Sequence, residues 1–211
     1  MHAVAEEAAL LDGAWQDVQP APARRLLVAA VQAFAERGYH ATTTRDISTR
    51  VGLSPAGVYV YYKSKEELLH RICQISHAHS LDAIRSAAAR FPHDPVAQLG
   101  SVVGDFAAWH ARYHIPARVI SYALAALSPP HYDEIVGVRH QIDLVVRSTL
   151  EQGVAAKLFD VAEVAGTARA LLSLTIDVAR WYRSSGRQAP EDIGRLYADL
   201  AVRMVSAGPG G

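Results

Sequence analysis

The chain has 211 residues, 50% of them apolar, and its 21 basic side chains balance its 21 acidic ones. It contains no uncharged apolar run of about 18 residues, so we expect no membrane-spanning segment and no membrane partner. Its one cysteine, Cys73, excludes a disulfide framework and is typical of a reducing compartment, so we expect a cytoplasmic protein.

Charge is unevenly distributed along the chain. Residues 1–20 carry four acidic side chains and no lysine or arginine, whereas residues 21–71 carry eight basic side chains against four acidic ones. A local positive excess favours binding to a polyanion such as nucleic acid. We therefore expect residues 1–20 to be an acidic extension that precedes a nucleic-acid-binding domain.

The basic region begins with two predicted helices. Apolar residues at helical spacing predict a helix from Pro22 to Arg37, which Gly38 is placed to end. Thr43 or Thr44 can cap a second helix, which stops at Gly52.

Two further helices follow. Ser54 precedes a third helix with Pro55 at its first position, where the missing N–H has no structural cost. A fourth opens with Ser64 and Glu67 in capping-box spacing and extends to about Ser86. The second and third helices, joined by a turn that contains glycine, have the pattern of a helix-turn-helix motif.

In such a motif the second helix enters the major groove of DNA and the first lies across the phosphate backbone. Thr43, Thr44 and Arg45 stand at a helix start, where hydroxyls, free N–H groups and a cation suit a phosphate. Ala56 and Gly57 are small enough to let the helix approach the groove floor.

Four larger side chains extend this predicted interface. Tyr59 and Tyr61 lie about 200° apart around a helix, so each can reach a phosphate on one flank of the groove. Lys63 and Lys65 lie just beyond the helix end and can reach the DNA backbone. We assign Tyr62 to the core instead.

Residues 24–69 resemble the DNA-binding domain of TetR-family transcriptional repressors. The resemblance rests on four runs that occur in order: Ala30 to Tyr39, Thr43 to Ile47, Val51 to Ser54, and Gly57 to Leu68. It implies binding to double-stranded DNA through Thr43, Thr44, Arg45, Ser54, Pro55, Ala56, Gly57, Tyr59, Tyr61 and Lys65.

The chain departs from the family at its base-reading positions. Pro55, Ala56 and Gly57 offer no side-chain hydrogen bond. Arg45 is therefore the first candidate for a contact with guanine.

Beyond residue 68 the pattern predicts helices separated by short breaks and no strand of useful length. We expect an all-α fold with a three-helix helix-turn-helix domain over residues 21–67. A larger helical ligand-binding and dimerisation domain should span residues 68–206, followed by a flexible tail over residues 207–211.

The family resemblance implies that the carboxy-terminal domain binds a small-molecule effector and forms a homodimer. Two segments with apolar faces, Val161 to Arg183 and Pro190 to Ser206, can pair with their symmetry mates as a four-helix bundle. A dimer would set two recognition helices about 34 Å apart, one turn of DNA.

Candidate pocket residues are aromatic and apolar side chains interleaved with a few polar ones. Asp177 lies inside an apolar helical run, and a buried acid needs a partner, which could be an arginine or a ligand. The full set of candidates is Phe106, Trp109, His110, Tyr113, Arg118, Tyr122, Arg139, Asp177, Arg180 and Trp181.

The carboxy-terminal half also resembles TetR-type regulators of fatty-acid and steroid-ring catabolism that respond to coenzyme A thioesters. This resemblance rests on Arg180 to Ile193, Tyr197 to Ala201, Leu127 to His131 and Gly153 to Ala156. It implies an acyl-CoA effector, with no resident cofactor, and CoA phosphates held by arginines. The available cations are Arg112, Arg118, Arg139, Arg180 and Arg183.

Other functions remain as alternatives. A repressor of the drug-efflux type would sense another hydrophobic molecule, and an architectural DNA-binding protein would have no pocket. A metal sensor could use His110 and His114, which face one side of a helix, although no cysteine or carboxylate set completes a site. The sequence has no Gly-rich phosphate loop, nucleophile elbow or HExxH motif, so we do not expect an enzyme.

Overall fold

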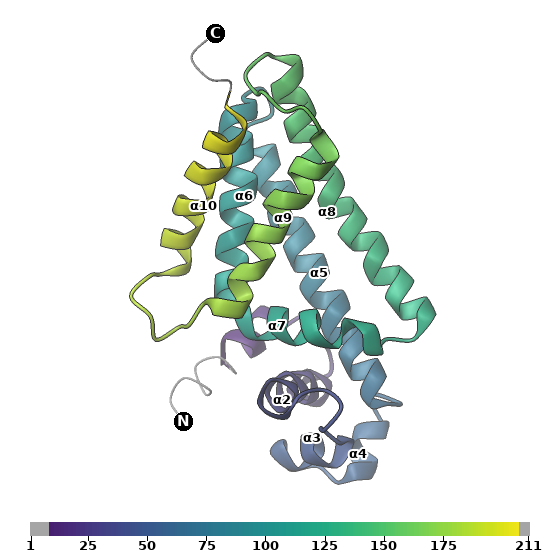
Figure 1. Ribbon diagram of the computed structural model, residues 1–211. Helices are drawn as coiled ribbons and strands as arrows, with labels where there is room; N and C mark the ends of the chain where they lie inside the picture. The colour runs from purple at the N-terminus through teal and green to yellow at the C-terminus, as the bar shows by residue number, and fades with distance from the viewer. Residues whose placement is uncertain (1–8, 207–211) are drawn as a thin grey trace. The chain divides into compact units, whose positions relative to one another are not determined.

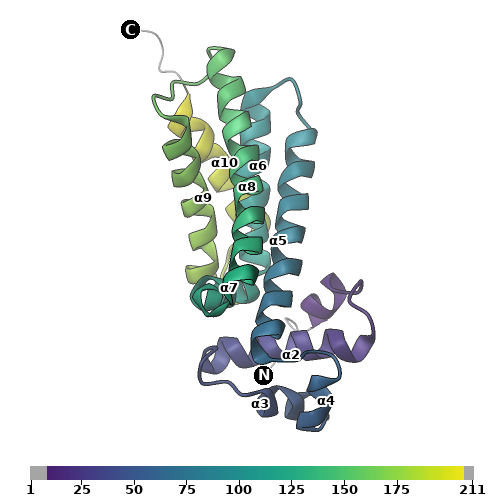
Figure 2. The ribbon, with the colours of Figure 1, turned by 90° about the vertical axis from the view of Figure 1, so that its right-hand side faces the viewer.

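The computed structural model describes residues 9–206, and within that range the protein consists of helices joined by short connections (Figures 1 and 2). The all-α prediction is thus confirmed. A short helical segment over residues 9–14 comes first. The helices that follow are α2 (Ala21–Arg37), α3 (Thr44–Arg50), α4 (Pro55–Tyr59), α5 (Lys65–Ala89), α6 (Pro95–Arg112), α7 (His114–Ala123), a 3₁₀ turn (Leu124–Ala126), α8 (Pro129–Ala155), α9 (Val164–Trp181) and α10 (Pro190–Val205). None of the described helices is long and apolar enough to cross a membrane.

The chain forms two compact units. The first unit comprises residues up to Ser76 together with Ile115–Ile135, and the second comprises His77–His114 together with the residues from Val136 onward. This division differs from the sequence-based boundary at residue 67, because α5 continues without a break past that position and α7 joins the first unit. Helices α5 and α8 each contribute residues to both units. The predicted tail, residues 207–211, lies outside the described residues.

Local capping residues set the helix ends of the first unit. Gly38, at φ 80°, ends α2 in a backbone conformation that favours glycine. Thr43, not Thr44, caps α3, and its side chain accepts a hydrogen bond from the Asp46 N–H. Ser54 caps α4 and accepts from the Gly57 N–H. The sequence predicted each of these ends to within one or two residues.

The core of the first unit forms where α2, α3 and α4 meet the start of α5. Leu27, Ile47, Val58 and Leu68 are fully buried there. Tyr62 is also buried, as predicted, and its hydroxyl donates to a backbone carbonyl, that of Ala23 (3.3 Å). Burial of such side chains is the main favourable contribution to folding.

The described part of the acidic extension packs on the first unit. Leu11 and Trp15 are buried in its core. Arg24 Nε donates to Asp12 Oδ1 at 2.7 Å, an ion pair that joins the extension to α2. Residues 9–20 are therefore part of the folded unit, while residues 1–8 lie outside the described residues.

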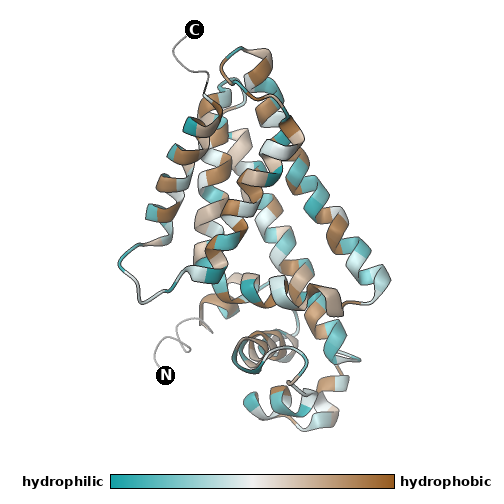
Figure 3. Cartoon of the chain, viewed as in Figure 1, coloured by the Kyte–Doolittle hydropathy of each residue, from teal (hydrophilic) through white to brown (hydrophobic). Residues whose placement is uncertain are grey.

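The second unit is a bundle of long helices, with α10 beside α6 (Figures 1 and 2). Polar and apolar stretches alternate along α9 and α10 (Figure 3), as expected for helices that bury one face. The bundle core is apolar, and it includes Leu99, Val102, Phe106, Leu150 and Leu171.

Two glycines allow α6 and α10 to approach closely. A Cβ atom added to Gly104 would lie 3.0 Å from the Gly194 carbonyl oxygen, and one added to Gly194 would lie 2.8 Å from the Gly104 carbonyl oxygen. The backbones of the two helices therefore touch at this crossing, where no other residue fits without displacement.

Two boundaries in this half differ from the sequence prediction. The break placed at Ile115-Pro116 occurs earlier, at Tyr113, because Pro116 fits the first turn of α7, where an N–H has no helical acceptor. Helix α9 begins at Val164 instead of Val161, because the Glu163 carboxylate accepts from the first N–H groups of the helix, including that of Ala165 at 3.0 Å.

Replacing Gly194 with alanine should lower the free energy of unfolding by about 1–3 kcal/mol, because the new methyl group must displace a helix backbone. Denaturant titration followed by circular dichroism measures the change. Gly137→Ala in α8 is the matched control, since its added Cβ has nothing within 4 Å, and it should stabilise by about 0.5–1 kcal/mol. Equal effects of the two substitutions would contradict this account of the crossing.

Candidate nucleic-acid interface and candidate pocket

The start of α3 is held by a reciprocal capping box. The Thr43 hydroxyl donates to Asp46 Oδ2 at 2.7 Å, the Thr43 N–H donates to the same oxygen at 2.9 Å, and Arg37 donates to Asp46 Oδ1 at 3.0 Å. The hydrogen bonds from Thr43 hold the pKa of the Asp46 carboxyl below its usual value. The Thr43 hydroxyl is thus engaged within the fold, and its contact with a phosphate stays a prediction.

Thr44 and Tyr59 lie together on the surface that α3 and α4 share. Thr44 Oγ1 and the Tyr59 hydroxyl are 3.3 Å apart, within hydrogen-bond distance, and the Tyr59 side chain is exposed. Arg45 is exposed beside them and makes no ion pair with any described residue. The structure therefore brings three of the predicted DNA contacts into one exposed region.

The short helix α4 presents small side chains to solvent. Ser54, Pro55 and Ala56 are exposed, and Gly57 is half-buried, with its nearest neighbour the side chain of Leu53. Val60, which follows the helix and was not among the predicted contacts, is far more exposed than Tyr59. From the sequence, its exposure could be predicted only from its position two residues after Val58, on the opposite side of the helix.

The ammonium group of Lys65 has backbone partners that the sequence did not suggest. Its Nζ atom donates to the carbonyls of Tyr39 (2.8 Å), His40 (3.3 Å) and Thr42 (2.8 Å) and lies 4.4 Å from the centre of the Tyr39 ring. Burial lowers the pKa of Lys65. Lys65 therefore holds the α2–α3 connection to the start of α5, and its contact with DNA stays a prediction.

Two more predicted contacts lie at this end of α5. Tyr61 is half-buried and Lys63 is exposed. The α5 cap resembles the predicted capping box, because Ser64 Oγ accepts from the Glu67 N–H at 2.9 Å. The Glu67 carboxylate, however, accepts from the N–H of Lys63, one residue earlier than expected.

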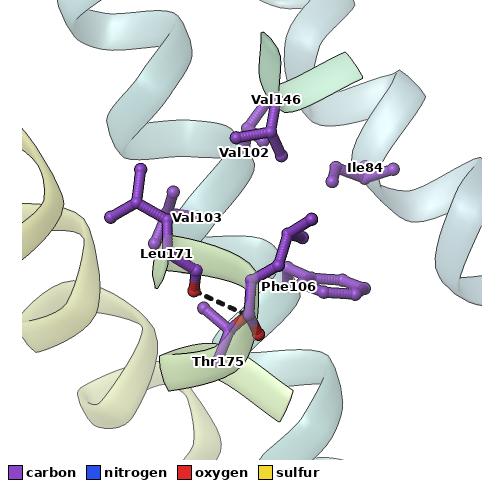
Figure 4. Close-up of a pocket in the computed structure, with 8 residues that line it drawn as sticks. Ile84, Val102, Val103, Phe106, Val146, Leu171 and Thr175 are labelled. Carbon is purple, nitrogen blue, oxygen red and sulfur yellow. Dashed lines mark hydrogen bonds between the residues drawn. The ribbon is translucent and has the colours of Figure 1, made fainter. Parts of the chain in front are cut away.

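The second unit contains a narrow apolar void in its core (Figure 4). None of it is wide enough for a water molecule. Its one polar wall residue, Thr175, donates its hydroxyl to backbone carbonyls of α9, among them that of Leu171 at 3.2 Å. The lining residues are Ile84, Val102, Val103, Phe106, Val146, Leu171, Leu172 and Thr175.

His110 lies next to this void, with its ring edge-on to that of Phe106 at 4.4 Å between centroids. Its Nδ1 atom is 2.9 Å from the Phe106 carbonyl oxygen, so Nδ1 carries the proton and donates to that oxygen. Burial lowers the pKa of His110 to about 4. The imidazole is therefore neutral at physiological pH.

A second histidine brings a cation into the same unit. Arg139 Nε donates to His77 Nε2 at 3.1 Å, so His77 accepts through Nε2. The positive charge of Arg139 adds to burial, the larger cause, in lowering the pKa of His110. His110 and Arg139, two predicted pocket residues, thus belong to one polar cluster in the second unit.

Trp109 lies on another side of α6, and Tyr113 directly follows the helix. Their rings are 5.2 Å apart, and Trp109 lines a surface groove between α6 and α10 together with Arg112 and Glu191, which form an ion pair. Trp109 does not line the apolar void. Of the predicted pocket residues, only Phe106 does so.

The structure corrects the expectation for the end of α9. Asp177 is not buried: it is exposed and pairs with Arg180 at 3.3 Å, and Trp181 is 43% exposed. The error arose because α9 carries apolar side chains on two faces, and Asp177 lies beside the outward one. Arg118 and Tyr122 belong to the first unit, where Tyr122 is exposed. Within the second unit, the candidates therefore lie in separate groups: Phe106 at the void, His110 with Arg139, Trp109 with Tyr113, and Asp177 with Arg180.

Within residues 9–206, no group of three or more histidine, cysteine, aspartate or glutamate side chains is arranged to hold a metal ion. His110 and His114 each direct Nδ1 to a backbone carbonyl, those of Phe106 and Ala111. These bonds account for one nitrogen of each ring.

Comparison with known proteins places both halves of the chain in one family. Residues 26–72 match the family described as bacterial regulatory proteins of the tetR family, and residues 92–205 match the tetracyclin repressor-like C-terminal domain. The second match covers more than half of the chain.

Individual relatives agree with this match. The transcriptional repressor KstR2 of Mycolicibacterium smegmatis is 27% identical over 91% of this chain and 95% of its own length. A tetR-family regulatory protein from Rhodococcus RHA1 is 38% identical and superposes with a TM-score of 0.83 over 88% of this chain and 97% of that one. AibR, crystallised with isovaleryl coenzyme A and operator DNA, shares the fold at 21% identity and a TM-score of 0.71, over 87% of this chain and 97% of that one.

Stability should decrease on acidification because of His110. The unfolded imidazole takes up a proton near pH 6.5 and the folded one only near pH 4, so the unfolded state binds more protons between these values. The contribution of the neutral His110 imidazole to the free energy of unfolding is complete above pH 6.5, and it decreases toward pH 4 by up to about 3 kcal/mol. Denaturant titrations from pH 7.5 to 4 measure it.

His110→Leu removes the titrating group and should flatten this pH dependence. His93→Leu, at an exposed site, should keep the wild-type dependence. If His110→Leu and wild type lose stability in parallel between pH 6.5 and 4, the buried neutral imidazole is not the cause.

Proposed function

The chain belongs to the TetR family of bacterial transcriptional regulators, and we propose that it represses transcription as a homodimer that binds a palindromic operator and is released by a small apolar effector. The family and the relatives above are regulators, not enzymes. The proposal includes an acyl-CoA thioester of fatty-acid or steroid catabolism as the effector and the cytoplasm as its location.

The first unit supports the DNA-binding part of the proposal. Arg45 and Tyr59 stand exposed beside Thr44 on α3 and α4, and the reciprocal cap of α3 and the three carbonyl bonds of Lys65 fix the backbone that carries them. A backbone that is already fixed loses little entropy on binding. This fixed and exposed surface is the observation that carries the proposal.

An exposed apolar face supports the dimer. Leu196, Leu200 and Met204 follow one another at four-residue spacing along the outer face of α10 and are each 45–53% exposed. Leu174 and Trp181, seven residues apart on α9, are 47% and 43% exposed. Large apolar side chains aligned on neighbouring helices favour burial against a second copy, in a four-helix arrangement with two-fold symmetry.

The apolar core of the second unit supports a hydrophobic effector. Ligand pockets are usually about 300–1,000 Å³, whereas this void has no room even for a water molecule, so it must widen when a ligand enters. AibR was crystallised in complex with isovaleryl coenzyme A, a thioester, and this supports a thioester effector for this chain too. The acyl chain would occupy the void, and arginines such as Arg139 would bind the phosphates of coenzyme A.

Helix α5 provides a physical link between the two activities. It is one uninterrupted helix, in which Lys65 holds the α2–α3 connection and Ile84 lines the void. A ligand that displaces Ile84 can therefore bias the position of the DNA-binding helices. Such coupling requires that the ligand prefer one arrangement of the dimer over the other.

Leu200→Asp should convert the dimer to monomers and weaken operator binding. Each dimer would bury two unpaired carboxylates, so the dimer dissociation constant should rise roughly 100-fold or more. Analytical ultracentrifugation measures the assembly state and fluorescence anisotropy the DNA affinity. Leu158→Asp, at a similarly exposed leucine outside α9 and α10, should leave both unchanged. A Leu200→Asp variant that remains dimeric would show that this face is not the interface.

Long-chain or steroid-derived acyl-CoA should release the protein from its operator, whereas free coenzyme A should not. Val146→Leu narrows the void and should weaken this response several-fold without changing operator affinity. Val154→Leu, on the exposed side of the same helix, should respond like wild type. If no acyl-CoA releases the DNA, the thioester proposal fails, and release by another apolar compound would point to a different effector.

A further inference from the structure

The outward ridge of α4 lacks hydrogen-bonding side chains. Val58 is fully buried and so marks the inward direction of this helix. Ala56 and Val60 lie two residues before and after it, about 160° and 200° around the axis, and thus point away from the core. Val60 keeps helical backbone angles, at φ −66° and ψ −32°, so it continues the same ridge. The outward face of the helix therefore presents the methyl group of Ala56 and the isopropyl group of Val60.

Val60 is the most exposed large apolar residue of the described chain, at 76%. Its neighbours in the chain, Tyr59 and Tyr61, each carry a hydroxyl group, so Val60 is the aliphatic side chain of this stretch that is most open to solvent. The nearest polar side chains of the helix are engaged elsewhere: Ser54 Oγ accepts from the Gly57 N–H at 3.2 Å, and the Tyr59 hydroxyl is within 3.3 Å of Thr44 Oγ1. Ala56 and Val60 together offer only a small aliphatic surface, which suits one small apolar target better than a protein surface.

We propose that Val60, supported by Ala56, determines operator specificity by packing against the 5-methyl group of a thymine in the major groove. The inference rests on the proposed operator binding and names the base that the same site would read. The thymine methyl is the apolar group that a base pair presents in the major groove, and alanine and similar side chains contact it. A cytosine at that position would place its amino donor against the isopropyl group, where it loses a water partner without gaining another.

Arg45 and Val60 would then have different tasks. The guanidinium of Arg45 on α3 supplies charge and can bind a phosphate or a guanine. Val60 offers neither charge nor hydrogen bonds, so its contribution depends on base identity alone. Its removal should change sequence preference while leaving the salt dependence of binding as it was.

The test begins with selection of an operator by the full-length protein from a random duplex library. Each thymine of the selected duplex is then replaced singly by deoxyuridine, which removes only the 5-methyl group. Fluorescence anisotropy gives the affinity of wild type, Val60→Ala and Val60→Thr for every duplex. Val154→Ala, an exposed valine of the second unit, is the matched control.

Wild type and Val154→Ala should lose roughly 3- to 10-fold in affinity at one thymine of each half-site, as expected for one buried methyl group. Val60→Ala should show no such loss at that thymine, and Val60→Thr, of nearly the same shape, should show a smaller one. If Val60→Ala keeps every deoxyuridine penalty of wild type, or if wild type has none, the inference is overturned. Failure to enrich any duplex would instead remove the operator-binding proposal, and this inference with it.

Discussion

The geometry of the first unit depends on one ammonium group held by backbone carbonyls. The connection between α2 and α3 leaves carbonyl groups without helical partners, and such groups need other donors. Lys65 supplies them to Tyr39, His40 and Thr42 at once. Because Lys65 is also the first residue of α5, these bonds fix the start of that helix against the turn that leads into the capped α3. The exposed surface of α3 and α4 is built on this anchor.

The second unit is governed by a different constraint, since α9 and α10 carry apolar residues on two faces. The inward residues, such as Leu171, Val178 and Val205, close the core, while Leu174 and Leu200 remain exposed. Helix α9 thus provides part of the wall of the apolar void and, together with α10, a surface suited to a second copy. The close approach of α6 and α10 at their two glycines keeps the core dense, so an effector must move side chains to enter.

Much of the fold could be predicted because its signals are local. Ser54 with Pro55 and Thr43 with Asp46 mark helix starts through contacts within four residues, and the structure has helices at those places. The partners of Lys65 lie more than twenty residues away in sequence, so no local pattern indicated them. Asp177 was misplaced because a helix with two apolar faces has the same spacing as a buried one. The DNA contacts, the dimer and the effector are still predictions, because they involve molecules other than this chain.

The central claim is that the surface of α3 and α4 binds the DNA groove and that a paired copy binds the next turn. Hydroxyl-radical footprinting of the full-length protein on the DNA upstream of its own gene tests this claim most directly. We predict two protected segments on one face of the duplex, with centres about 34 Å apart. Protection of a single segment, or of none at low ionic strength, would contradict the account.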